Sequence, residues 1–282
     1  MIKVEFIFEK EYGKKMQTKV EGLLISKMPY AERDLIGTLL LRNGKKINCI
    51  FHGGRGGGSK KKSSILELGF MLKVDLQRAN RKGGREGEEL HTVKEWSLLW
   101  HHDKIRLDHK AFYLLCFFLE VIRKMSIYDE LHDEHRESDE NSCGLFKVLS
   151  NSLFYVEDQL KKENSFNSSL HLSLFLTKLL IELGVYPDRE VCHLCYRPLE
   201  TVGSMRLAFE QGGYICDTCL GEMGPPSGKA LWDLTGQMAN LSYKDYAKIS
   251  GSHPTWSRLL FDYLCFQFQI SEKDFLSSSM VL

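Results

Sequence analysis

Two pairs of cysteines are the residues of this chain whose type and spacing point most directly to chemistry. Cys192 and Cys195 form one C-x-x-C pair, and Cys216 and Cys219 form another after twenty intervening residues. Each pair places two thiolates on one side of a turn, and two such turns complete a tetrahedron around Zn²⁺. The pattern therefore predicts a four-cysteine zinc ribbon that holds one structural Zn²⁺, with residues 205–215 as its hairpin. A redox pair, or ordinary buried cysteines, is the alternative interpretation.

A basic, glycine-rich stretch at residues 51–64, FHGGRGGGSKKKSS, is the second candidate for chemistry. A phosphate-binding P-loop requires the order G-x-x-x-x-G-K-[ST], whereas Ser59 here precedes Lys60 and the following residues alternate as in a strand. Between Arg42 and Arg85 the chain carries twelve Lys and Arg against two acidic residues, a net charge of +10, although the whole chain has +1. This segregation of charge predicts a basic face for a polyanion.

The composition is that of a globular protein, with 43% hydrophobic and 27% charged residues in a chain of 282. The longest apolar run, residues 111–122, is broken by Glu120 and is too short to span a membrane. The N-terminus lacks the apolar core of an export signal, so the eight cysteines indicate a reducing cytoplasm. No Ser/His/Asp order and no paired carboxylates stand out, and we expect a protein that is not an enzyme. The acidic stretch 129–142 is expected to be a mobile loop between two helices.

The elements that must position these residues change character near residue 90. Turn signals, among them Asn43-Gly44, separate five or so short strand-like runs that fit a small barrel. These runs lie at residues 4–9, 19–28, 34–42, 45–52 and 64–76. Thr92 and Glu95 then form a capping box, which predicts that a helix begins in the segment HTVKEWSLLW. Further helices are expected at residues 107–125, 144–162, 169–183, 229–241, 243–249 and 254–268.

Three segments together resemble the RecO family of bacterial recombination mediators. Tyr30, Glu32 and Asp34 lie in a turn that is similar to the family's YGE-D signature. The strand KINCIFHGGRG and its basic continuation lie where the family has KGARR and a basic run. The segment LGVYPDREVCHLC is similar to the family's entry into its zinc site. The chain departs from the family in its glycine-rich residues 56–58 and in the acidic Glu272 and Asp274 of its closing helix.

The resemblance implies an α+β protein in which an N-terminal OB-fold β-barrel precedes an all-α helical domain with an embedded four-cysteine zinc ribbon. We place the barrel at residues 1–90 and the helical domain at residues 91–282, with the ribbon inserted at residues 190–220. The resemblance also implies DNA repair and homologous recombination. Such a mediator binds single- and double-stranded DNA, anneals complementary strands, and acts with RecR to load RecA onto DNA coated by single-strand-binding protein. An enzyme of nucleic-acid processing, such as a nuclease or ligase accessory with the ribbon as a docking module, is the alternative, and an adaptor without DNA contact is a third.

Loops between barrel strands hold nucleic acid in OB folds. This chain has two basic, glycine-bearing loops on one barrel, within residues 51–64 and at residues 77–87, which favour DNA as the polyanion. Loops that only keep the protein soluble are the competing interpretation. The predicted DNA-binding residues are Arg42, Lys45, Lys46, Arg55, Lys60, Lys61, Lys62, Arg78, Arg81, Lys82 and Arg85.

The family also implies that the helical domain binds the acidic, Phe-terminated tail of single-strand-binding protein. That tail requires an apolar pocket edged by cations. The helix FYLLCFFLEVIRKM combines aromatic residues with Arg123 and Lys124 at its end, so we predict the pocket there. The alternative interpretation is that Phe112, Phe117 and Phe118 simply belong to the core, and we expect this for most of them.

Overall fold

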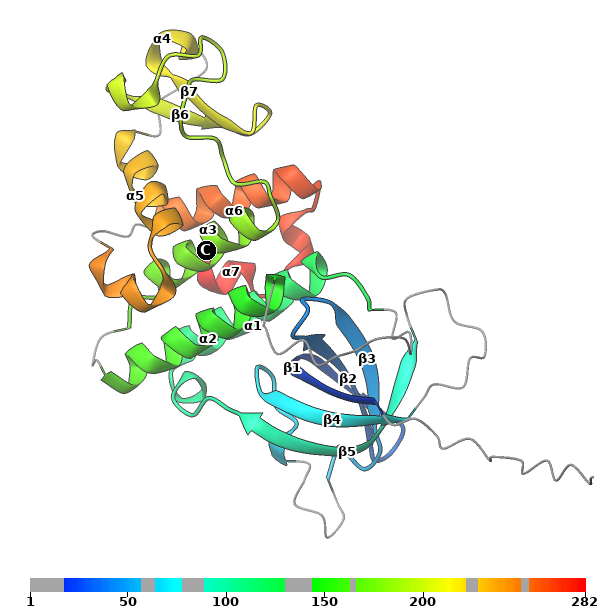
Figure 1. The fold of residues 1–282 in the computed structure, drawn as a ribbon. Helices are drawn as coiled ribbons and strands as arrows, with labels where there is room; N and C mark the ends of the chain where they lie inside the picture. Colours follow the sequence, from blue (N-terminus) through cyan, green and yellow to red (C-terminus); the bar gives the residue numbers. More distant parts are fainter. Residues whose placement is uncertain are drawn as a thin grey trace, which may run out of the picture.

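The computed structural model describes residues 18–56, 64–77, 89–129, 144–162, 166–221, 228–249 and 254–282. A β-barrel at the N-terminal side packs against one end of a helical domain, and a small two-stranded unit stands at the opposite end of that domain (Figure 1). The predicted α+β architecture is confirmed. The predicted first strand, residues 4–9, lies outside the described residues. The acidic stretch 129–142 does so too, except for Asp129.

The barrel is closed by five strands in the order β1-β2-β3-β5-β4, and β4 pairs back with β1. The strands are β1 (Thr18–Tyr30), β2 (Asp34–Leu41), β3 (Lys46–Phe51), β4 (Met71–Gln77) and β5 (Leu90–Trp100). All neighbouring strands are antiparallel except β3 and β5, which pair in parallel. Alternate side chains enter the barrel, among them Leu24, Leu39, Phe51, Leu72 and Val93, and form its own apolar core. This closed, five-stranded order is that of an OB-type barrel.

The hairpin between β2 and β3 turns at Asn43-Gly44, as the sequence predicts. Gly44 has a φ of 80°, a conformation that glycine adopts without strain. The Asn43 side chain accepts a hydrogen bond from the amide of Lys45, and the amide of Leu41 donates to the carbonyl oxygen of Lys45. The sequence therefore fixes both the place and the register of this turn.

The segment after residue 90 is a strand, so the prediction of a helix at Thr92 is wrong. Residues Leu90–Trp100 form β5, which pairs with both β3 and β4 and so completes the barrel. His91 and Val93 are buried on alternate positions, as in a strand. Two ladders of hydrogen bonds and a place in the barrel core outweigh a local capping signal. The barrel therefore extends ten residues beyond residue 90.

The helical domain is built around one large core that includes Phe117, Phe118, Phe175 and Phe261. Its helices are α1 (His109–Met125), α2 (Gly144–Lys162), α3 (Ser168–Glu182), α5 (Lys229–Asn240) and α6 (Pro254–Phe268). The predicted helical residues 243–249 form instead a 3-10 helix, Tyr243–Lys248. Helix α3 ends just before Gly184, the residue predicted to cap its C-terminus. Gly184 has a φ of 71°, and its backbone amide donates a hydrogen bond to the carbonyl oxygen of Ile181, as expected of such a cap.

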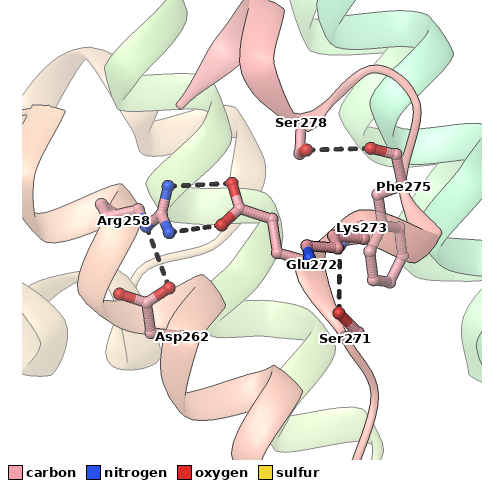
Figure 2. Close-up of polar contacts among 7 residues, drawn as sticks. All are labelled: Arg258, Asp262, Ser271, Glu272, Lys273, Phe275 and Ser278. Atoms are coloured by element: carbon pink, nitrogen blue, oxygen red, sulfur yellow. Dashed lines mark hydrogen bonds and ion pairs between the residues drawn. The ribbon is translucent and has the colours of Figure 1, made fainter.

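The last residues of the chain fold back over α1 and α6. Phe275 is buried against the rings of Phe117 and Phe261. Figure 2 shows how this return is held: both guanidinium ends of Arg258 on α6 bind the carboxylate of Glu272. The Nε atom of Arg258 also donates to Asp262 at 2.9 Å. This closing segment ends in the short helix α7 (Ser278–Val281).

A buried carboxylate fixes the connection between the barrel and the helical domain. Glu157 on α2 is only 3% exposed, and its two oxygens accept hydrogen bonds from the backbone amides of Asp103, Lys104 and Ile105. Burial raises the pKa of this carboxyl, but the three amides and the nearby Lys161 outweigh that effect and lower it overall. Glu157 therefore holds the segment that leaves β5 against α2.

Candidate metal centre and nucleic-acid interface

The four predicted cysteine ligands meet at one point of the small two-stranded unit. This unit consists of β6 (Met205–Ala208) and β7 (Gly213–Cys216), followed by the short helix α4 (Asp217–Leu220). The sulfur atoms of Cys192, Cys195, Cys216 and Cys219 all lie within 4.8 Å of one another. Tetrahedral Zn–S bonds of about 2.3 Å would place sulfur atoms about 3.8 Å apart, and the Cys195 and Cys216 sulfurs are 3.7 Å apart. The cluster therefore fits a four-thiolate metal site.

Backbone amides point at the buried sulfur of Cys192. Burial raises the pKa of this thiol, but hydrogen bonds from the amides of Cys216, Cys195 and Leu194 outweigh burial and lower the pKa to about 6. The amide of Cys216, for instance, lies 3.4 Å from the Cys192 sulfur. Because the thiolate is the form that binds metal, this arrangement favours a ligand at neutral pH. With four sulfurs at the site, no ligand position is left for a substrate.

One arginine joins the cysteine unit to the helical domain. The guanidinium of Arg189 lies over the ring of Trp232 on α5, 4.3 Å from its centre, and donates to the Trp232 carbonyl oxygen. The indole N–H of Trp232 in turn donates to the carbonyl oxygen of Arg189. Gly236 leaves the space that the guanidinium occupies, because a side chain there would meet it. A folded cysteine unit therefore anchors the start of α5.

Three of the predicted DNA-binding cations lie on the β2–β3 hairpin, which packs against the helical domain. Arg42 donates to Glu21 at 2.8 Å and lies over the ring of Phe146 on α2. Lys45 is 3.9 Å from a carboxylate oxygen of Asp129. Their charges are thus partly balanced by neighbours within the chain. These two residues remain predicted contacts, at the border between the domains.

Lys46 is enclosed in the same junction. Its side chain is 9% exposed, donates to the carbonyl oxygen of Arg123 at 2.7 Å, and lies 4.6 Å from the centre of the Tyr128 ring. The backbone of Lys46 also bonds to Ile127 and Asp129. An ammonium with these partners has little surface left for phosphate, so Lys46 is not part of the interface that we propose below.

Arg55 lies at the other end of β3 and is exposed. Its guanidinium is 3.3 Å from the carbonyl oxygen of Ala31, in the turn between β1 and β2. This turn is one of the loops with which OB folds bind oligonucleotides. The other predicted contacts, Lys60, Lys61, Lys62, Arg78, Arg81, Lys82 and Arg85, lie outside the described residues.

The family model described as "Recombination protein O C terminal" matches residues 107–264, more than half of the chain. The chain belongs to the RecO family. A DNA repair protein RecO of Bacillus cytotoxicus is 27% identical over 249 residues, which cover 83% of this chain and 87% of the relative. A DNA repair protein RecO of Desulfatibacillum aliphaticivorans is 25% identical over 200 residues, which cover 70% of this chain and 69% of the relative. Membership places this protein in DNA repair and recombination.

A solved structure with an OB-type domain resembles this RecO-family chain only weakly. The structure titled "OBody NL8 bound to hen egg-white lysozyme" covers 30% of this chain and 96% of that chain, at 18% identity and a TM-score of 0.25. A likeness at that level supports no assignment. The fold rests instead on the strand order and on the RecO family match.

The matched RecO region contains the predicted tail-binding residues, Arg123 and Lys124, at the end of α1. Both side chains are exposed, and the Lys124 ammonium lies 5.2 Å from the centre of the Phe275 ring. Phe117 and Phe118 are fully buried, so they belong to the core. The ammonium of Lys124 thus already contacts an aromatic ring of the chain itself, that of Phe275, whereas the side chain of Arg123 is exposed to solvent.

The acidic residues that distinguish this chain from its family's pattern are engaged within the closing segment. Glu272 binds Arg258 (Figure 2). Asp274 accepts a hydrogen bond from the backbone amide of Ser271. These carboxylates stabilise the return of the chain over α6 and offer phosphate no attraction.

Within the described ranges, the four cysteines are the one group of three or more potential ligands close enough to share a metal ion. None of the helices in that part of the chain combines the length and apolarity needed to traverse a bilayer. Sequence reasoning predicted all four members of the cysteine cluster. It missed the exposed Met28 and Tyr30 on the outer face of β1, because single apolar residues in a strand give no signal of their own.

Proposed function

We propose that this protein is a recombination mediator that binds single- and double-stranded DNA, anneals complementary strands, and acts with RecR to load RecA onto DNA coated by single-strand-binding protein. The proposal places it in the bacterial cytoplasm, at the nucleoid, without enzymatic activity of its own. One observation carries it: an OB-type barrel precedes a helical domain that matches the RecO family.

The barrel supplies the DNA contact in this proposal. The guanidinium of Arg55 lies against the β1–β2 turn. The three lysines at residues 60–62 follow it in the chain. Contacts to phosphates bind any sequence, as a mediator requires. They also make affinity depend steeply on salt.

The cysteine cluster holds one structural Zn²⁺ in this proposal. Its place at the far end of the helical domain from the barrel (Figure 1) separates it from the DNA contact. Bound metal would keep the C-x-x-C turns closed and, through Arg189 and Trp232, support the start of α5.

The test is binding of the purified protein to a labelled single strand and to a duplex of the same length, across a salt series with Mg²⁺ present. We expect both to bind, a log–log salt slope of several units, and intact DNA at the end. An annealing assay with complementary strands then tests the mediator step. Cleavage that requires this protein would instead favour a nucleic-acid-processing enzyme, and no DNA binding at low salt would refute the proposal.

A further inference from the structure

The outer face of the barrel carries exposed apolar side chains at the end of β1. Met28 is 57% exposed and Tyr30 is 48% exposed. In the register of the sheet, Met28 lies opposite Ile36, and Ile36 lies opposite Ile50 on β3. Because side chains alternate along a strand, this row lies on the side opposite to Leu35 and the barrel core. The outer face of strands β1–β3 therefore carries a short apolar strip, formed by Met28, Ile36 and Ile50, with Tyr30 at its end. The row on the other side of this strip is polar, because Thr38 there donates a hydrogen bond to Asn48.

The same end of the strip carries positive charge. Arg33 and Arg55 are both exposed, and the amide of Arg55 bonds to the carbonyl oxygen of Arg33. Asp34, next to them, is already engaged: it accepts hydrogen bonds from the Gly53 amide at 2.9 Å and shares one of 2.8 Å with His52. These bonds, with that of the Gly53 amide first, lower the pKa of the Asp34 carboxyl.

We propose that Tyr30 stacks on a base of single-stranded DNA, and that this stacking gives the protein its preference for single strands over duplex. The inference rests on the proposed DNA-binding function. Bases of a single strand can turn out onto an aromatic ring, whereas those of a duplex are stacked on one another and cannot reach it. Arg33 and Arg55 hold the neighbouring phosphates, and Met28 with Ile36 extends the apolar surface below the ring.

Single-stranded nucleic acid fits this surface better than a protein partner does. Single-strand-binding barrels combine aromatic stacking with a positive groove, and the outer strand face with the β1–β2 loop is where OB folds bind oligonucleotides. Arg33 and Arg55, at the turn that follows Tyr30, complement phosphate. The carboxylate of Asp34, which lies opposite Tyr30 in the sheet, is occupied by its hydrogen bonds to Gly53 and His52. Glu32 is the exception, as an exposed carboxylate in the same turn.

The first experiment compares Tyr30→Ala and Tyr30→Phe with the wild type, using a labelled single strand and the matching duplex. Loss of one base stack weakens binding about tenfold. We expect that loss for the single strand with Tyr30→Ala, nearly wild-type affinity with Tyr30→Phe, and unchanged duplex affinity for both. Tyr196→Ala, which removes a tyrosine that is 76% exposed on the cysteine unit, is the matched control and should change neither. Thermal unfolding of each variant checks that the barrel is intact.

A single strand with abasic positions separates stacking from phosphate contact, because it keeps its phosphates and lacks bases. The wild type should bind it more weakly than the normal strand, and Tyr30→Ala should bind both about equally. The stacking role would be overturned if Tyr30→Ala lost the same affinity for single strand and duplex, or lost affinity for neither. The second of these results would favour a protein partner for the apolar strip. A wild-type protein that binds no DNA would overturn the proposed function as well, so the two failures are distinguishable.

Discussion

The ammonium of Lys46, on strand β3, donates a hydrogen bond of 2.7 Å to the carbonyl oxygen of Arg123 in the last turn of α1. This bond links the barrel to the helical domain through a charge placed at the negative end of a helix. The parallel bridge between Lys46 and Tyr128 continues the same contact along the backbone. A residue that the sequence marks as a DNA contact thus lies in the joint between two domains.

Replacing Lys46 with methionine should destabilise the protein rather than its DNA complex. A buried hydrogen bond from a charged donor contributes about 1.5–3 kcal/mol, so the free energy of unfolding should fall by that order in chemical denaturation. Lys45→Met, which removes the neighbouring and more exposed ammonium, is the control and should have a smaller effect. A salt slope for DNA binding that drops by about one unit in Lys46→Met would assign this residue to phosphate after all.

Metal removal should affect the cysteine unit and leave the DNA contact in place. We expect one Zn²⁺ per chain by elemental analysis, and none in Cys192→Ser, with a lower temperature of unfolding. DNA affinity of the folded variant should stay near that of the wild type, because the cluster lies at the far end of the helical domain from the barrel (Figure 1). Cys265→Ser, outside the cluster, should keep its metal. A purified protein without zinc, or with a disulfide under reducing conditions, would contradict the metal assignment.

The buried His171 should make the protein less stable in acid. Its ring bonds to Gln159 at 2.8 Å, and burial lowers its pKa to about 4. Below about pH 6.5 the unfolded chain binds a proton that the folded ring does not, so the unfolding free energy falls by up to about 1.4 kcal/mol per pH unit until about pH 4. Above about pH 6.5 the ring is neutral in both states, so the contribution of His171 to the unfolding free energy no longer changes with pH.

Denaturation curves between pH 7 and pH 4 test this effect. The variant His171→Gln keeps a polar partner for Gln159 and should show a shallower loss of stability toward acid, whatever its stability at pH 7. His101→Gln, in which the replaced ring is exposed, should keep the wild-type slope. An unchanged slope in His171→Gln would mean that other groups cause the acid sensitivity.

The three consecutive lysines Lys60, Lys61 and Lys62 are predicted phosphate contacts. Their joint replacement by alanine should weaken DNA binding about equally for unrelated sequences and reduce the log–log salt slope by about one unit per lost contact. Replacement of Lys110, Lys147 and Lys273, exposed lysines of the helical domain, removes the same charge and serves as the control. If both triple variants lower the slope alike, the effect comes from net charge and the lysine run is not a site.

Arg123 is the predicted cation for the acidic tail of single-strand-binding protein. Arg123→Glu should weaken binding of a labelled tail peptide at least several-fold, as measured by fluorescence anisotropy. The reason is that a carboxylate at this position repels the carboxylates of the tail. Bare-DNA binding should remain, since the barrel is a separate domain and distant sites act nearly independently. Lys110→Glu, at the opposite end of α1, is the control. Equal peptide affinity in wild type and Arg123→Glu would exclude this pocket, and no affinity in either would count against the mediator role.

The amino-acid sequence by itself determined the features that depend on local chemistry. The spacing of Cys192, Cys195, Cys216 and Cys219 sufficed to predict the cluster, because each C-x-x-C turn brings its two sulfurs together with no help from the rest of the fold. Gly44 and Gly184 marked a hairpin and a helix end for the same reason: their positive φ angles are a property of single residues. The apolar period of residues 144–162 predicted helix α2 over the residues that the structure describes there.

Tertiary structure decided whatever depends on partners distant in the chain. Residues 90–100 carry a helix signal, yet they are a strand, because β3 and β4 offer them hydrogen bonds that no local pattern reveals. Likewise, Lys45 and Lys46 have the same charge and adjacent positions, but only one ammonium is enclosed by Arg123 and Tyr128. Sequence supplies the charge of a side chain; the packing of one domain on another decides whether that charge faces water, and only a charge that faces water can meet DNA.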